Sequence, residues 1–233
     1  MKIYFLVEGR RTEKKVYTAW LKHLLPELNR MTYCDDAVTD GYFLISGEGY
    51  PSLIYDHLPA AIADINRVGG YNYLAVSLDA DEDSVIARHE EINSFVAQQG
   101  SPLRNAKLIV IVQNRCIETW FLGNRRIVTR NPQSQILCDY LAYYDVRQQD
   151  PEMMGCHSSY LTHSQFHLHY LKELLQAKSL SYTKNRPGHV LEQSYLAELQ
   201  ARVHDQPTDL ASLQVFLNFC QEIKFGMNNS LSV

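Results

Sequence analysis

The sequence has few cysteines, no long apolar run and no excess of basic charge, and each absence excludes a class of protein. The five cysteines are odd in number and form no Cys-x-x-Cys pair, which argues against a disulfide framework and a cysteine-rich zinc site. The first apolar run, Ile3 to Val7, is too short for a signal peptide or a membrane span. We therefore expect a cytoplasmic protein with reduced thiols.

The formal charge of −4 does not indicate a nucleic-acid partner, which a basic chain would have done. The acidic residues are concentrated at 79–91, however, and an acidic site that works with a bound metal is less negative than its formal count. The 233 residues, of which 45% are hydrophobic, are enough for a sizeable core.

The first half of the chain alternates between short apolar runs and amphipathic stretches. The expected strands are 2–7, 42–45, 73–78 and 108–112, and the expected helices are 12–28, 51–68, 84–98 and 117–122. The last strand is continuously apolar, which is typical of a parallel sheet that is buried on both faces. This βαβαβαβα order predicts an α/β fold with a four-stranded parallel sheet flanked by helices.

From about residue 132 onward the sequence shows no convincing strand. The pattern predicts helices at 134–148, 164–178, 189–203 and 208–222, with loops at 150–160 and 181–188. We therefore expect two domains. Residues 1–130 would form the metal-binding α/β domain, and residues 131–233 would form a helical extension packed on it.

Carboxylates follow two of the predicted strands. Asp79, Asp81 and Asp83 come directly after strand 73–78, and alternate residues of an extended chain point the same way, so Asp79 and Asp81 can act together. Glu8 ends the first strand, and ligand sites in open α/β sheets gather at that edge. If the two strands are neighbours, these carboxylates need a cation, and hard oxygen ligands suit Mg²⁺ or Mn²⁺. The alternative is that they are solvated residues that begin helices.

Three stretches resemble the TOPRIM domain shared by topoisomerases, primases and OLD-type nucleases, and in particular small bacterial OLD- and RloB-like TOPRIM proteins. They are Val7-Glu8-Gly9-Arg10-Arg11-Thr12-Glu13, Leu78-Asp79-Ala80-Asp81 and Cys116-Ile117-Glu118-Thr119-Trp120-Phe121-Leu122. The resemblance covers about residues 1–125. It implies a Mg²⁺-dependent or Mn²⁺-dependent nuclease that cleaves DNA or RNA. Several of these relatives act in phage defence, so a partner ATPase and a homo-oligomer are also expected.

The resemblance assigns roles to the acidic residues. Asp79, Asp81 and Asp83 would hold the metal, while Glu8 would ligate it or act as general acid or base. Glu118 would approach the same site as a further carboxylate.

Three basic residues are candidates for contacts with phosphate. Arg10 and Arg11 follow Glu8 directly and are placed to bind the substrate's backbone. Lys184 lies in the basic loop 181–188, and related nucleases use a lysine from outside their core motifs. It would contact phosphate or stabilise the transition state, although the loop would also suit a simple solvated turn.

Other patterns leave alternatives open. Asp79-x-Asp81-x-Asp83 with Glu90 at the twelfth position is similar to an EF-hand loop, but Ser84 stands where that loop needs glycine. A dense group of metal-binding residue types suggests zinc, although its spacing matches no closed structural site. Its members are Cys156, His157, His163, His167 and His169. Two further functions stay open, a nucleotide-binding or primase-like protein and a non-catalytic interaction module.

Overall fold

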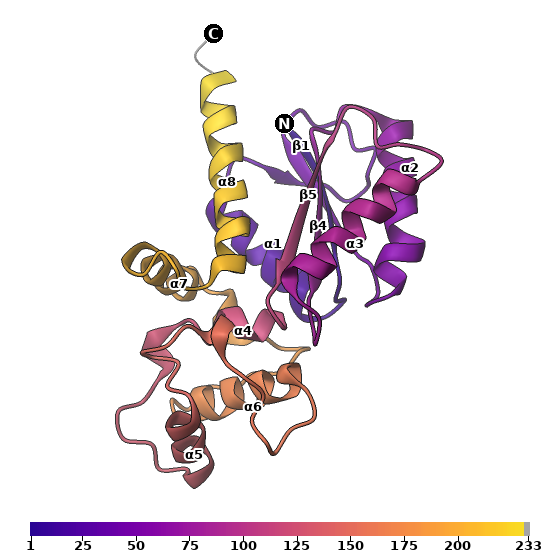
Figure 1. Cartoon of the computed structure of the whole chain (residues 1–233). Helices are drawn as coiled ribbons and strands as arrows, with labels where there is room; N and C mark the ends of the chain where they lie inside the picture. Colours follow the sequence, from indigo (N-terminus) through magenta and orange to yellow (C-terminus); the bar gives the residue numbers. More distant parts are fainter. Residues whose placement is uncertain (231–233) are drawn as a thin grey trace. The chain divides into compact units, whose positions relative to one another are not determined.

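A computed structural model describes residues 1–230 and contains a five-stranded parallel sheet with the order β2-β3-β1-β4-β5 (Figure 1). The strands are β1 (Lys2–Val7), β2 (Asn29–Arg30), β3 (Gly41–Ser46), β4 (Tyr73–Asp79) and β5 (Lys107–Gln113). The predicted α/β class is confirmed, and four strands lie within one residue of their expected bounds. The expected strand number was one too few, because β2 has only two residues and shows no periodicity.

The chain forms two compact units. Among the described residues, unit 1 contains 1–78, 86–112 and 216–230, and unit 2 contains 79–85 and 113–215. We had expected a division at residue 130. The difference arises because the last helix, α8 (Ala211–Ser230), is shared: its later part returns to the sheet, where Phe219 contacts Phe5 with ring centroids 6.1 Å apart.

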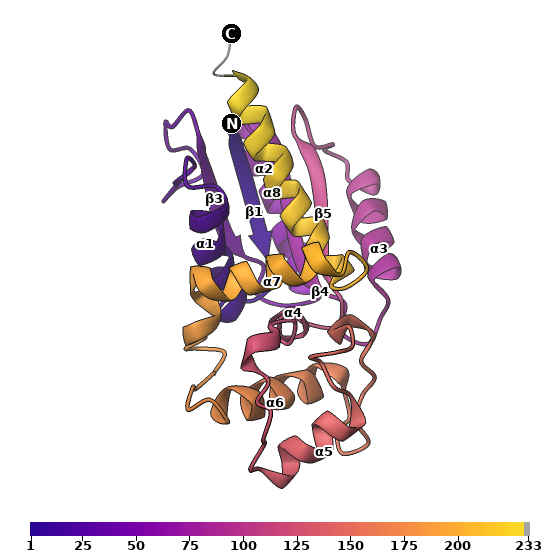
Figure 2. The same ribbon diagram turned by 90° about the vertical axis from the view of Figure 1, so that its left-hand side faces the viewer.

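Unit 1 has helices on both faces of its sheet. Figures 1 and 2 show α1 (Thr12–Leu24) and the later part of α8 on one face, and α2 (Leu58–Val68) and α3 (Val85–Gln98) on the other. A π-helical turn, Leu53–His57, leads into α2. The first helix ends four residues earlier than expected because Pro26 follows it, and a proline disfavours helical backbone in the residue before it.

Unit 2 is mainly helical. Its helices are α4 (Ile117–Phe121), α5 (Gln135–Tyr143), α6 (His163–Gln176), α7 (Gln193–Asp205) and the first turn of α8, with 3-10 turns at Arg125–Ile127, Pro151–Met153 and Gly188–Leu191. Each predicted helix is present with shifted ends. The absence of strands after residue 132 is also confirmed for the described residues. Within the described chain, no helix has both the length and the apolarity needed to cross a membrane.

Candidate active site

The carboxyl ends of β1 and β4 lie at the same edge of the sheet. The two strands are parallel neighbours with Val7 opposite Ser77. Glu8 follows β1 directly and donates its backbone N–H to the Ser77 carbonyl at 2.9 Å. Asp79 is the last residue of β4. The sequence-based expectation that these two carboxylates follow adjacent parallel strands is therefore met.

Within unit 1, the loop after β3 holds Glu8 in place. The Oε1 atom of Glu8 accepts a hydrogen bond from the Tyr50 backbone N–H at 3.2 Å, and the Glu8 carbonyl accepts one from Gly49 N–H at 3.0 Å. The Arg88 guanidinium lies over the Tyr50 ring, with its Cζ atom 3.9 Å from the ring centroid. The Tyr50 hydroxyl donates a hydrogen bond to Glu91 at 3.1 Å. The loop after β3 therefore fixes the Glu8 carboxylate, and the contacts of Tyr50 with Arg88 and Glu91 hold this loop in place.

The residues after Glu8 have distinct local roles. A Cβ atom at Gly9 would lie 1.9 Å from a carboxylate oxygen of Glu13, so glycine leaves the space that this largely buried side chain fills. Arg10 forms an ion pair with Glu48, and that hydrogen bond lowers the pKa of the Glu48 carboxyl. Arg11 is exposed at the start of α1. Arg11 is thus open to a ligand, whereas Arg10 would have to leave Glu48.

In unit 2, two turns are tied together beyond the ends of β4 and β5. The backbone N–H of Asp81 donates to the Arg115 carbonyl at 2.8 Å, and the Arg115 side chain donates back to the Asp81 carbonyl at 3.2 Å. Both residues have left-handed backbone, with φ of 51° at Asp81 and 69° at Arg115. Such non-glycine conformations are unfavourable and cluster at functional sites.

These turns change the expected directions of the aspartates. The backbone is not extended at Asp81, so the alternation that would align its side chain with that of Asp79 does not hold. The Asp81 Oδ1 accepts a hydrogen bond from Ser164 Oγ at 3.2 Å. Asp83 is exposed, and its backbone carbonyl accepts a bond from Arg115 at 3.3 Å. Of the three aspartates, Asp79 is the buried one, with 9% of its surface exposed.

Glu118 is a fully buried carboxylate in the first turn of α4. Its Oε1 accepts a hydrogen bond from the Tyr182 hydroxyl at 2.8 Å, and Lys184 Nζ lies 3.9 Å from the same oxygen. Its Oε2 is buried and has no hydrogen-bond partner among the described residues. Because buried carboxylate oxygens are costly to leave unsatisfied, Glu118 Oε2 marks a position for a cation or a hydrogen-bond donor.

The buried thiol of Cys116 is affected by the charges of both Glu118 and Asp79. Burial is the main cause that raises the pKa of Cys116 well above its usual value, and the charges of Glu118 and Asp79 raise it further. Both carboxylates therefore lie near the same thiol within unit 2. Glu118 does not face bulk solvent, and its charge and that of Asp79 act on the same thiol.

The Asp79 and Glu118 carboxylates offer oxygen ligands, which hard cations such as Mg²⁺ prefer. Mg²⁺ commonly takes one or two protein carboxylates and completes its shell with waters and substrate phosphates. Across residues 1–230, no three His, Cys, Asp or Glu side chains are arranged to enclose a metal ion. Asp79 and Glu118 would thus hold a partly hydrated ion, with Glu118 Oε2 supplying an available oxygen.

Comparison with protein-family models, curated proteins and solved structures finds no match. The likeness to the TOPRIM domain therefore rests on the motifs and on the strand-end geometry described above.

The histidines that suggested a zinc site contact other protein side chains in the structure. His163 Nδ1 lies 2.6 Å from Glu82, and His167 Nδ1 lies 2.7 Å from the Thr119 hydroxyl. Burial, aided by the charge of His163, lowers the pKa of His167 to about 3, so its ring is neutral. His157 packs edge-on against Tyr140 and Tyr143. These side chains serve packing and hydrogen bonding in unit 2.

The structure also speaks against the EF-hand alternative. The residues before Asp79 form β4, where an EF-hand needs a helix, and Glu90 is an exposed residue within α3.

Sequence reasoning missed several residues around the carboxylates. Tyr182 lies in the predicted basic loop, two residues before Lys184, but a lone tyrosine there gave no functional signal. Arg115 precedes the third TOPRIM-like stretch, and only its left-handed backbone and its bonds to the Asp81 turn reveal its role. Tyr50 follows the Gly-Glu-Gly turn and was not distinguished from other turn residues.

Proposed function

We propose that this protein is a metal-dependent nuclease that hydrolyses phosphodiester bonds in DNA or RNA. The observation that carries the proposal is the buried Glu118 carboxylate, which has one oxygen without a partner among the described residues and Lys184 3.9 Å from the other. Asp79 and Glu118 would hold Mg²⁺ or Mn²⁺. When bound, such a cation polarises the phosphate and lowers the pKa of an attacking water.

The protein's own residues would position the substrate. The Lys184 side chain is half exposed, so its ammonium can meet a phosphate oxygen from solvent while staying close to Glu118. The Tyr182 hydroxyl fixes Oε1 of Glu118 and so sets the direction of Oε2. Arg11, and Arg10 once it is released from Glu48, would bind the substrate's backbone.

Glu8 is the carboxylate that the TOPRIM resemblance adds from unit 1. It follows β1, the strand beside β4, and its carboxylate accepts a hydrogen bond from the Tyr50 backbone N–H. The resemblance would make it a metal ligand or a general acid or base. Asp81 and Asp83 would be further metal ligands from the turn after β4. The Ser164 hydroxyl donates a hydrogen bond to the Asp81 carboxylate and so orients it.

A non-catalytic or nucleotide-binding role is the second candidate. The Arg10–Glu48 ion pair favours it, because this contact occupies a cation that a nuclease would use for phosphate. The resemblance further suggests a role in phage defence beside a partner ATPase, and a homo-oligomer stays a further expectation.

The nuclease proposal is tested by incubating the purified full chain with plasmid DNA and with total RNA. We expect cleavage with Mg²⁺ or Mn²⁺ and none with EDTA, and we expect Asp79→Ala to abolish it while the fold stays intact. Asp79 is buried, and a buried carboxylate charge is costly without a cation, so the metal-free variant should melt at the same temperature or higher. Cleavage that persists in EDTA and in Asp79→Ala would refute the proposal.

A further inference from the structure

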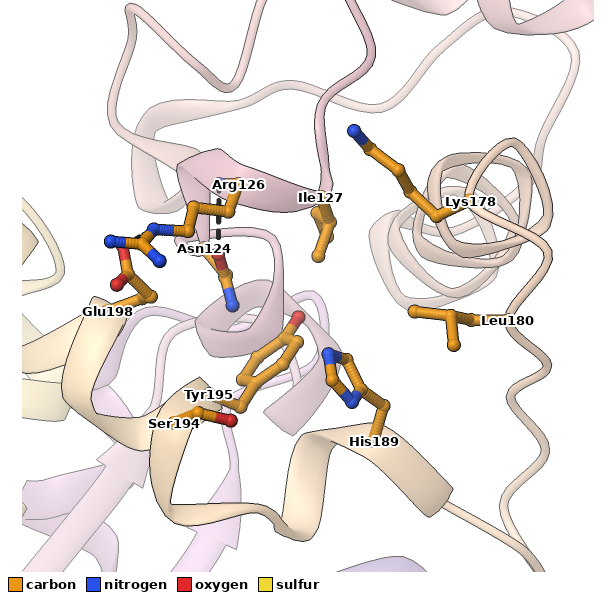
Figure 3. A pocket seen from close by; sticks show the side chains of 9 residues that line it. All are labelled: Asn124, Arg126, Ile127, Lys178, Leu180, His189, Ser194, Tyr195 and Glu198. Atoms are coloured by element: carbon orange, nitrogen blue, oxygen red, sulfur yellow. Dashed lines mark hydrogen bonds and ion pairs between the residues drawn. The ribbon is translucent and has the colours of Figure 1, made fainter.

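A pocket of about 230 Å³ lies within unit 2, between the chain after α4, the segment after α6 and the start of α7 (Figure 3). Ile127 and Leu180 give it apolar walls, while polar groups reach into it from the side chains of Asn124 and His189. Pockets for drug-sized ligands are larger, roughly 300–1,000 Å³. The space therefore suits a single ring system.

Asn124 presents an unused hydrogen-bond donor to this pocket. The residue is only 3% exposed, and its Oδ1 accepts a hydrogen bond from the Arg126 backbone N–H at 2.9 Å. That bond identifies the amide oxygen, so the other end is the NH₂ group, which points into the pocket in Figure 3. This NH₂ makes no hydrogen bond within residues 1–230. The NH₂ is therefore free to donate a hydrogen bond to a ligand in the pocket.

His189 supplies a complementary acceptor. Its Nδ1 lies 2.8 Å from Glu192 Oε1, and this carboxylate keeps a proton on Nδ1. A ring that holds its one proton on Nδ1 offers Nε2 as an acceptor. The ring stands edge-on to Tyr195, with centroids 5.7 Å apart, which fixes its orientation. A donor and an acceptor beside apolar walls match the hydrogen-bonding edge of a nucleobase.

Lys178 adds a positive charge at the rim. Its side chain is exposed and forms no ion pair within the described chain, and Figure 3 shows its ammonium above the pocket. The other cation at the rim, Arg126, is already paired with Glu198 at 2.9 Å. Lys178 is thus the group available to a phosphate.

We propose that this pocket binds one nucleotide, with its base between Ile127 and Leu180 and its phosphate on Lys178. The base edge would accept from Asn124 and donate to His189. The pocket is connected to the carboxylates through α4, which carries Glu118 and is followed by Asn124. If the pocket holds one nucleotide of the nucleic-acid substrate, the inference rests on the proposed nuclease function. If it binds a free nucleotide, the inference does not depend on that function.

Isothermal titration of the full chain with each of the four ribonucleoside 5′-monophosphates, in EDTA, tests the inference. We expect saturable binding of at least one of them and weaker binding of orthophosphate. Asn124→Asp retains the acceptor for the Arg126 N–H but replaces the donor with a negative charge, so it should weaken binding more than tenfold. Lys178→Glu, at an exposed position, should do the same without affecting folding.

Lys224→Glu is the matched control, because it makes the same charge reversal at an exposed lysine of α8, and its affinity should stay within twofold of the wild type. The inference is overturned if no nucleotide binds saturably, if orthophosphate binds as tightly as the nucleotides, or if both pocket variants bind like the wild type.

The two proposals fail in different ways. Saturable nucleotide binding by a chain whose cleavage persists in EDTA and in Asp79→Ala would reject the metal-dependent nuclease alone. Cleavage by a chain that binds no mononucleotide would reject the pocket alone.

Discussion

Glu118→Gln should reduce metal-dependent cleavage by about 10²–10⁴-fold, the range seen when a group with a direct role in proton transfer or charge stabilisation is lost. Glutamine has the same shape and can still accept the hydrogen bond that Tyr182 donates at 2.8 Å. It removes the negative charge, however, and with it the attraction for a cation at Oε2 and for Lys184. The loss would therefore reflect charge and not packing.

A gel-based cleavage assay under single-turnover conditions measures this effect. The matched control is Glu222→Gln, which makes the same chemical change on an exposed residue of α8 and should cleave at the wild-type rate. Melting of metal-free Glu118→Gln should match or exceed the wild type, because the Glu118 carboxylate is fully desolvated while Lys184 is half exposed and stays hydrated after the change. Wild-type cleavage by Glu118→Gln would show that Glu118 only supports the packing of α4.

Arg202→Met should lower the free energy of unfolding by about 3–5 kcal/mol, because it removes one partner of a buried ion pair. Arg202 is 2% exposed and pairs with Asp209 at 2.8 Å. Its guanidinium also donates to the carbonyls of Gly123, Val146 and Gln149. Burial lowers the pKa of Arg202, and the contact with Asp209 acts in the opposite direction. Methionine would remove this donor from the three carbonyls and leave Asp209 with its longer ion pair to Arg125, at 3.7 Å.

Equilibrium unfolding in urea, followed by circular dichroism, provides the comparison. Arg126→Met makes the same substitution at a side chain that is 79% exposed and paired with Glu198, and it should cost at most about 1 kcal/mol. Equal losses in the two variants would mean that the Arg202 network does not hold unit 2 together.

The sheet could be predicted well because its central strands have a simple pattern. Residues 3–7 of β1 are all buried, so the strand appears in the sequence as an uninterrupted apolar run. Turn and helix signals then separate it from the next strand. By contrast, β2 has two exposed residues and no burial pattern, so nothing in its sequence distinguishes it from a loop.

The destination of α8 could not be predicted. Its amphipathic pattern shows that one face is buried, but the pattern does not identify the surface that covers this face. The structure places Phe216 against Tyr17, with centroids 5.0 Å apart, and Phe219 against Phe5. The last helix therefore contributes to the core of unit 1, and a boundary drawn along the sequence misses this return.

The candidate site shows the same limit at the level of side chains. Strand ends alone predicted the shared edge of Glu8 and Asp79. The contact between Tyr182 and Glu118 joins residues 64 positions apart, and no local pattern reports it. The direction of Asp81 was also out of reach, because its left-handed backbone depends on the bond to the Arg115 carbonyl.

Binding of Mn²⁺ to the full chain, measured by electron paramagnetic resonance, tests the central claim most directly, because it does not depend on finding the right substrate or a partner protein. We predict that the wild type binds one Mn²⁺ per chain and that the double variant Asp79→Asn, Glu118→Gln does not, whereas Glu222→Gln binds like the wild type. A wild-type chain that leaves all Mn²⁺ in solution, or a double variant that binds it equally well, would contradict the assignment of these two carboxylates to a catalytic metal.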